Sequence, residues 1–212
     1  MYSNMENNNF SKTYNTLNKL GYINPNADTY LWLDDMEWMS SDEINNYKYE
    51  EGELRSLIPF AHTSGGDKWV WIKISGEDDY AVGLCETEEV YGIYYAKNTE
   101  AAIVRQIIEY VAGSNFYINE NDAKSYQISE DQLKLQLLEW MHILKDIISE
   151  ENIRLISDLR KKHLKQTNSK YGNWYALLSK EEEEELIKEY IGFDMLNQRF
   201  GITLGEPWII EN

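Results

Sequence analysis

The sequence predicts an α+β protein, with an antiparallel or mixed sheet of about four to six strands flanked by helices and followed by a helical extension. Four short apolar segments follow one another between residues 58 and 96, and the gaps between them are short and rich in Gly, Asp, Ser and Glu, which favours hairpins. Apolar residues recur at helical spacing after residue 98 and again after residue 129. Hydrophobic residues make up 42% of the 212 residues and aromatic residues 13%, so the chain can bury a core and is not disordered throughout.

The first elements are short. Phe10, Tyr14, Leu17 and Leu20 have the spacing of one helical face, and Gly21 is expected to end this helix. Residues 23–28 are turn material, residues 30–33 are predicted to form a strand, and residues 41–44 are predicted to begin a small helix because acidic residues occupy its first turn.

The predicted sheet is built from residues 58–61, 68–74, 80–86 and 92–96. In the second of these strands, Val70 and Ile72 face one way while Trp69 and Trp71 face the other. Because both faces carry apolar residues, we expect the sheet to be covered at least partly on both sides.

The remaining elements are mainly helical. Asn98 or Thr99 is expected to cap a helix that Gly113 ends and whose apolar face consists of Ile103, Val104, Ile107, Ile108 and Val111. Residues 114–127 are polar and predict a loop or linker. Residues 129–148 predict a helix, and Ser149 begins another. Ser179 and Glu182 match a capping box at the start of a last helix, which Gly192 ends.

These patterns predict three parts of the chain. Residues 1–9 are expected to be a flexible polar tail, which lacks the apolar segment of a signal peptide. Residues 10–113 are predicted to form the α+β domain, and residues 114–212 a helical extension packed on the same domain, because isolated amphipathic helices of this size rarely stand alone in water.

The chain is strongly acidic, with 20 basic and 37 acidic residues and a formal charge of −17. Residues 28–100 contain 17 acidic and 5 basic residues, a local charge of −12. Such a surface repels nucleic-acid phosphates and anionic lipids and attracts basic partners. We therefore expect no nucleic-acid or membrane partner, although solubility alone also explains acidic cytosolic proteins. The polar start of the chain, without a signal peptide, and the absence of an apolar run of ~20 residues favour a soluble cytoplasmic protein.

The sequence shows no catalytic set or metal site. His62, His142 and His163 lie far apart, with no metal-ligand spacing, although Asp67 is placed to hold His62 beside the turn. Cys85 is the single cysteine, so it forms no intramolecular disulfide, and the adjacent Glu86 is expected to raise its pKa. Residues 65–67 fit a hairpin turn better than a phosphate loop. We expect no metal, no cofactor and no enzymatic activity.

The candidate site is a surface that binds a partner. Three acidic clusters offer contacts for lysine and arginine: Asp34-Asp35-x-Glu37, Glu77-Asp78-Asp79 and Glu86-x-Glu88-Glu89. The second and third clusters are expected near opposite ends of the strand at residues 80–86. Trp69 and Trp71 become anchor candidates if they are exposed, since tryptophan dominates interface hot spots. The full set of candidates is Asp34, Asp35, Glu37, Asp67, Trp69, Trp71, Glu77, Asp78, Asp79, Glu86, Glu88 and Glu89.

Residues 30–112 resemble a known family. Four segments carry the resemblance: Leu31-Trp32-Leu33, Ser40-Ser41-Asp42-Glu43-Ile44, Ile58-Pro59-Phe60-Ala61 with Gly66-Asp67, and residues 98–111. In this order, they look like the strand, the helix start, the central hairpin and the closing helix of the Smi1/Knr4 (SUKH) superfamily. The leucine-proline helix and asparagine-glycine-glycine turn with which members usually begin are absent from this sequence.

The resemblance implies a mixed sheet flanked by helices, no enzymatic activity, and the function of a bacterial immunity protein that neutralises a cognate toxin. Many such toxins are nucleases, which are basic because they bind phosphate, so an acidic partner suits them. Two alternatives remain open: a regulatory or scaffold protein of the same superfamily, and a hydrolase that uses paired carboxylates near Asp67. The oligomeric state, the toxin and the acidic cluster that makes the contact stay undetermined.

Overall fold

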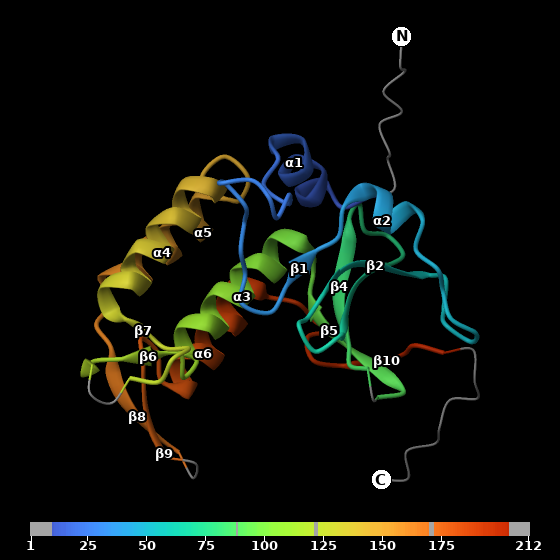
Figure 1. The fold of residues 1–212 in the computed structure, drawn as a ribbon. Coiled ribbons are helices and arrows are strands. Elements are labelled where there is room, and N and C mark those ends of the chain that lie inside the picture. Colours follow the sequence, from blue (N-terminus) through green and yellow to red (C-terminus); the bar gives the residue numbers. More distant parts are fainter. Residues whose placement is uncertain (1–9, 88, 121–122, 170–171, 204–212) are drawn as a thin grey trace. The chain divides into compact units, whose positions relative to one another are not determined.

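The computed structural model describes residues 10–87, 89–120, 123–169 and 172–203 (Figure 1). The predicted flexible tail at residues 1–9 and the candidate Glu88 lie outside these residues. The chain forms two compact units: unit 1 comprises residues 1–30, 36–99 and 195–212, and unit 2 comprises residues 31–35 and 100–194. Both units contain helices and strands, so the predicted α+β class is confirmed.

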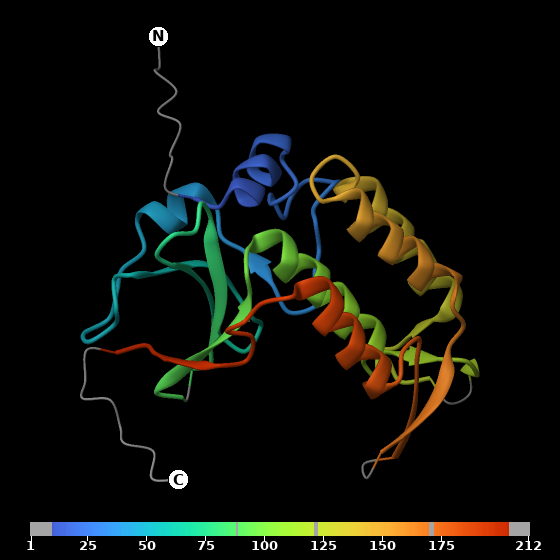
Figure 2. The same ribbon diagram turned by 180° about the vertical axis from the view of Figure 1, so that it is seen from behind.

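Unit 1 is built on a six-stranded antiparallel sheet of order β1-β2-β3-β4-β5-β10. The strands are β1 (Glu37–Trp38), β2 (Leu57–His62), β3 (Lys68–Lys73), β4 (Tyr80–Cys85), β5 (Tyr91–Ala96) and β10 (Arg199–Gly201). Figure 2 shows β10 in red beside β5 in green, although more than a hundred residues separate them in the sequence. The four strands from β2 to β5 are the ones that the four apolar segments and the short gaps between them predict.

One face of this sheet carries the aromatic core of unit 1. Trp69 and Trp71 are 1% and 0% exposed, and Phe60 stacks on Trp71 with ring centroids 4.6 Å apart. Helix α1 (Lys12–Leu20) adds Tyr14, whose ring meets Trp71 edge-on at 5.0 Å. The indole Nε1 of Trp71 donates a hydrogen bond to Thr99 Oγ1 at 3.0 Å, which satisfies a polar group that is otherwise buried.

The opposite face carries a second apolar cluster. Leu57, Val70 and Cys85 are buried there, and Phe200 of β10 packs against them. The ring of Phe200 occupies the space that side chains would fill at Gly83 and Gly92, since a Cβ at either position would lie 2.6 and 2.4 Å from the ring. The sheet of unit 1 is therefore covered on both faces, as the sequence predicts.

The helices of unit 1 begin and end where local chemistry favours it. The N–H of Gly21, in the left-handed conformation with φ of 80°, donates to Asn18 O, and the N–H of Tyr22 donates to Leu17 O, which closes α1. Helix α2 (Ser41–Asn45) starts with a capping box, in which the Ser40 hydroxyl accepts from the N–H of Glu43 and the Glu43 carboxylate accepts from the N–H of Ser40.

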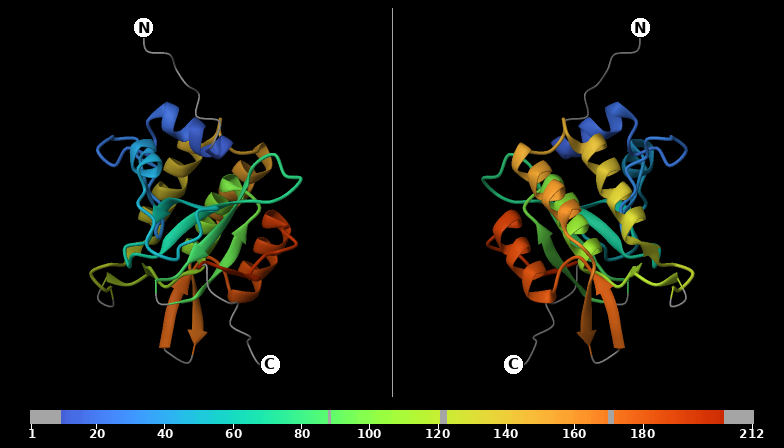
Figure 3. Two further views of the ribbon diagram at one scale, coloured as in Figure 1. Left: turned by 90° about the vertical axis from the view of Figure 1, so that its right-hand side faces the viewer. Right: turned by 90° about the vertical axis from the view of Figure 1, so that its left-hand side faces the viewer.

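Unit 2 combines helices with a four-stranded mixed sheet of order β7-β6-β9-β8. Its helices are α3 (Thr99–Ala112), whose first residue belongs to unit 1, α4 (Glu130–Leu144), α5 (Glu150–Lys161), α6 (Lys180–Leu186) and the π-helix η2 (Ile187–Ile191). Its strands are β6 (Phe116–Tyr117), β7 (Ile128–Ser129), β8 (Lys165–Ser169) and β9 (Gly172–Ala176), and Figure 3 shows the β8–β9 hairpin as two orange arrows. The fully buried Trp140 donates through Nε1 to Trp32 O at 2.7 Å.

Two details differ from the sequence-based expectations. Residues 30–33 form no strand; Leu31 and Leu33 are buried, so the apolar run there accompanies burial without sheet pairing. The region after residue 113 is not only helical, because it also carries β6 to β10.

The predicted capping box of Ser179 and Glu182 and the helix end at Gly192 are both present. Within the described part of the chain, no helix combines the length and apolarity needed to cross a membrane.

Candidate functional site

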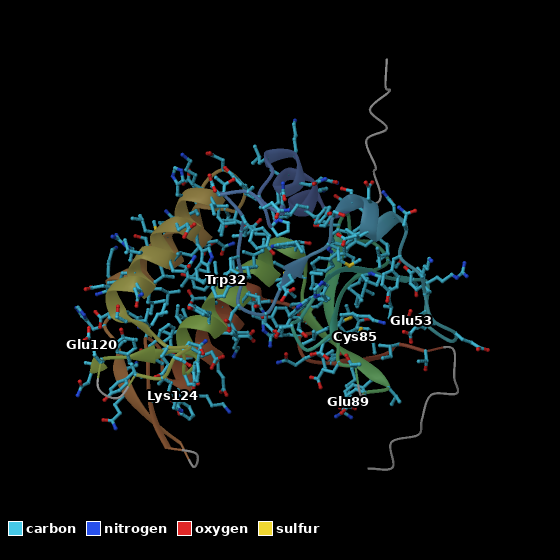
Figure 4. The ribbon with its side chains drawn as sticks, viewed as in Figure 1. Trp32, Glu53, Cys85, Glu89, Glu120 and Lys124 are labelled. Carbon is cyan, nitrogen blue, oxygen red and sulfur yellow. The ribbon has the colours of Figure 1, made fainter. Side chains whose placement is uncertain are left out.

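A cavity of about 400 Å³ opens at one end of the sheet of unit 1. Its walls are the β2–β3 turn, the β4–β5 turn, the segment 49–54 that precedes β2, and the residues that follow β10. The segment and the chain after β10 are joined by backbone contacts: Leu54 N–H donates to Ile202 O at 3.2 Å, and Glu53 and Thr203 form an isolated antiparallel bridge. In Figure 4 the labelled Glu53, Cys85 and Glu89 lie together beside the strands of unit 1.

The floor of the cavity is apolar. Leu57, Val70 and Cys85 are 8%, 2% and 7% exposed, and Leu54 and Ile202 complete the floor as partly buried side chains. Pairing puts Lys68 opposite Cys85 and Leu57 opposite Ile72, so these side chains project from the same face of the sheet. The floor is thus formed by part of the second apolar cluster.

Lys68 extends over this floor and is held by Glu53. Its ammonium forms a hydrogen-bonded ion pair with the Glu53 carboxylate, and it lies 5.7 Å from the centre of the Tyr47 ring. Although burial favours the neutral amine, the bonds to Glu53 and Tyr47 raise the pKa of Lys68. Burial likewise opposes ionisation of Glu53, but the bonds from Lys68 and from Glu50 N–H leave its pKa lowered. Both groups are charged at neutral pH.

The rim of the cavity is acidic. Glu50, Glu51, Glu86 and Glu89 line it and are exposed. With Glu53 and Lys68, the lining holds five carboxylates and one ammonium group, a net charge of −4 at neutral pH. Among the residues that the structure describes, no lysine or arginine forms an ion pair with any of the four rim glutamates.

The Asp67 carboxylate connects the β2–β3 turn to the β4–β5 turn by hydrogen bonds within the protein. Its Oδ1 accepts hydrogen bonds from Thr87 N–H at 2.9 Å and from Thr87 Oγ1 at 3.1 Å, and its Oδ2 accepts one from Thr63 Oγ1 at 3.2 Å. The bond from Thr87 N–H contributes most to a lowered pKa of Asp67. A general acid needs a raised pKa, so the geometry does not favour Asp67 for that role. Gly66 makes the turn possible, because its φ of 92° belongs to the left-handed region.

The acidic candidates are divided between several places. Glu86 and Glu89 line the cavity, whereas Glu77, Asp78 and Asp79 lie in the β3–β4 turn at the other end of β4, as the sequence predicts. Asp34 and Asp35 belong to unit 2, where Asp34 accepts a hydrogen bond from Asn115 Nδ2 at 3.5 Å. The three clusters therefore do not form one continuous surface within unit 1.

Trp69 and Trp71 require a correction. Their proposed role as anchors depends on exposure, but both are almost completely buried. The alternation is the reason: side chains at these two positions face the aromatic core, while Lys68 and Val70 face the cavity. They stabilise the sheet and offer no surface to a partner.

His62 also has a different partner from the one expected. Its Nδ1 lies 3.6 Å from Glu37 Oε2, across the pairing of β1 with β2, whereas Asp67 bonds to the two threonines. Glu37 and His62 line a second cavity of about 490 Å³ in unit 1. The other carboxylate that lines this second cavity belongs to Glu43, and it accepts a hydrogen bond in the capping box of α2. The second cavity therefore presents no pair of carboxylates available for acid–base chemistry.

Cys85 is a structural residue of the floor. Burial, more than any neighbouring carboxylate, raises the pKa of its thiol to about 12; Lys68 lowers it and Glu53 raises it. The predicted direction is correct, but the charge that contributes is Glu53 and not the adjacent Glu86. The thiol is neutral at physiological pH and hence a poor nucleophile.

Sequence reasoning missed the segment 49–54 as part of the site. Glu50-Glu51-Gly52-Glu53 was a detectable signal, since three carboxylates around a glycine form an acidic turn. Among the described residues, no group of three or more His, Cys, Asp or Glu side chains is arranged to hold a metal ion. The site is thus a partly apolar cavity with an acidic rim. Comparison with known protein families, curated proteins and solved structures finds no match to this chain.

Proposed function

We propose that the protein is a non-enzymatic binding protein of the immunity type, which neutralises a basic toxin domain through the acidic rim of unit 1. The observation that carries the proposal is the rim itself: Glu50, Glu51, Glu86 and Glu89 surround an apolar floor, and among the described residues no lysine or arginine forms an ion pair with any of the four. The resemblance of residues 30–112 to the Smi1/Knr4 superfamily supports the same function.

The physical argument concerns both the rate and the selectivity of association. Carboxylates gathered at one end of a domain accelerate the encounter with a basic surface and repel acidic proteins. A nuclease domain is basic where it binds phosphate, so an acidic protein that covers this surface competes directly with the nucleic acid. We place this activity in the cytoplasm, where such a toxin meets its substrate.

The test begins with capture of the product of a neighbouring toxin-like gene, co-expressed with the tagged full chain, followed by measurement of Kd at low and high salt. Replacing Glu50, Glu51 and Glu86 together with lysine should weaken binding by about tenfold or more, which corresponds to ~1.4 kcal/mol. Most of this loss should appear as a slower association rate that depends on salt.

The matched control reverses Glu77, Asp78 and Asp79, three acids at the opposite end of β4. This variant changes the net charge by the same amount and should keep Kd within about twofold of the wild type. Equal losses in both variants would assign the effect to net charge alone and overturn the proposed surface. A partner that binds with no salt dependence would favour the regulatory or scaffold alternative.

A further inference from the structure

The cavity beside the rim has the properties of a receptor for one long side chain. Its volume of about 400 Å³ lies at the small end of the range of protein ligand pockets. Val70, Leu57 and Cys85 form a floor that stays apolar even though the rim is charged. A side chain that enters must therefore combine an aliphatic stem with a polar end.

The charge of the cavity lining determines which charge the polar end of the entering side chain can carry. Five carboxylates face one ammonium group, and Glu53 already uses that ammonium of Lys68. Glu50, Glu51, Glu86 and Glu89 remain at the mouth, where a carboxylate or phosphate would be repelled. An entering cation would instead reduce the repulsion among them.

From this complementarity of shape and charge we propose that the cavity receives an arginine side chain of the protein partner. The inference rests on the proposed function and names the group by which the partner is held. The methylene stem of arginine packs on the floor at Val70 and Leu57, and its guanidinium lies at the rim. Arginine is favoured over lysine because its planar group donates to several carboxylates at once and is less strongly hydrated.

The first experiment uses two small probes, Nα-acetyl-arginine N-methylamide and its citrulline counterpart, an uncharged molecule of nearly the same shape. Each is titrated into the full ¹⁵N-labelled chain while amide resonances are recorded. The arginine probe should shift the resonances of Val70, Cys85 and Thr87 saturably, and the citrulline probe should bind at least about tenfold more weakly. Absence of a saturable shift with the arginine probe would overturn the inference.

The second experiment separates insertion from attraction to the rim. Ile202→Phe enlarges a partly buried side chain of the cavity floor and leaves every charge in place. It should weaken binding of the arginine probe by about tenfold or more, and Leu54→Phe, at the neighbouring residue whose N–H bonds to Ile202 O, should act in the same direction. Circular dichroism confirms the fold of each variant, and unchanged probe affinity in both folded variants would refute insertion.

The two proposals can fail separately. If reversal of the rim charges abolishes partner binding while Ile202→Phe has no effect on it, the acidic surface is correct and the arginine cavity is wrong. If the arginine probe binds in the cavity but the rim variants keep full affinity for the toxin domain, the cavity stands as an arginine site and the proposed function falls.

Discussion

Replacing Gly92 with alanine tests how β10 is held against the sheet. An alanine Cβ at this position would lie 2.4 Å from Phe200 Cζ and 2.7 Å from Cε2, closer than nonbonded atoms approach. Gly92 pairs directly with Phe200 across β5 and β10, so the ring has to leave its position or the strands have to separate. Either response loosens the wall that carries Ile202.

The expected cost follows from two opposing effects. Alanine in place of glycine within a strand stabilises by roughly 0.5–1 kcal/mol when no clash arises. Overpacking a filled site costs about 1–3 kcal/mol. We therefore expect Gly92→Ala to lower the free energy of unfolding by about 1–2 kcal/mol in the wild-type background. In a Phe200→Ala background the clash with the ring is absent, and the same change should be close to neutral, because of the three nearest atoms the Cys85 Sγ at 3.0 Å is the one that remains.

Urea denaturation of the four proteins of this double-mutant cycle gives the coupling energy directly. Native-state hydrogen exchange at the amides of β5 and β10 then locates the effect, and it should appear as faster exchange in Gly92→Ala alone. An equal cost of Gly92→Ala in both backgrounds would show that the ring of Phe200 is not what requires glycine, and would refute the reasoning.

Three further predictions concern other parts of the molecule. Thr99→Val leaves the buried Nε1 of Trp71 without its acceptor and should cost about 1–3 kcal/mol in urea denaturation, whereas Thr99→Ser should cost clearly less. Burial opposes ionisation of Glu130, but hydrogen bonds from Lys134, from Leu164 N–H and from His163 lower its pKa from 4.5 to about 2. Stability from the ionised group is thus present above about pH 4.5 and is lost as pH falls towards 2; Glu130→Gln should remove this part of the acid dependence of unfolding. The thiol of Cys85, with its pKa raised to about 12 by burial, should react with a thiol reagent at pH 8 at least about tenfold more slowly in the native protein than in urea, and equal rates would contradict its burial.

The sequence predicts the elements that local chemistry specifies. Strands β2 to β5 follow from four apolar segments joined by short turns, and helix α6 follows from the capping box of Ser179 and Glu182. Hairpin β8–β9 was not predicted, because β8 reads Lys-Gln-Thr-Asn-Ser and lacks an apolar alternation. Residues 30–33 show the converse error, since a short apolar run there forms no strand although Leu31 and Leu33 are buried.

The candidate site was predicted only in part, for a physical reason. Glu86 and Glu89 are recognisable as acidic turn residues, but the cavity depends on Glu53 and Thr203, which are far apart in the sequence and meet in an isolated bridge. No local pattern encodes such a meeting. Whether a tryptophan in β3 faces the core or the solvent depends likewise on which face of the sheet α1 covers.

The discontinuity of unit 1 has a consequence for how the protein is made on the ribosome. Strand β5 ends at Ala96, but its neighbour β10 begins at Arg199, so the whole of unit 2 is translated before the sheet receives its last strand. Until then, the nascent chain carries an unpaired β5 edge and leaves Gly83 and Gly92 without the ring that covers them. This interval is the stage of biogenesis at which an intermolecular strand, from a chaperone or from another nascent copy, competes most effectively for the same edge.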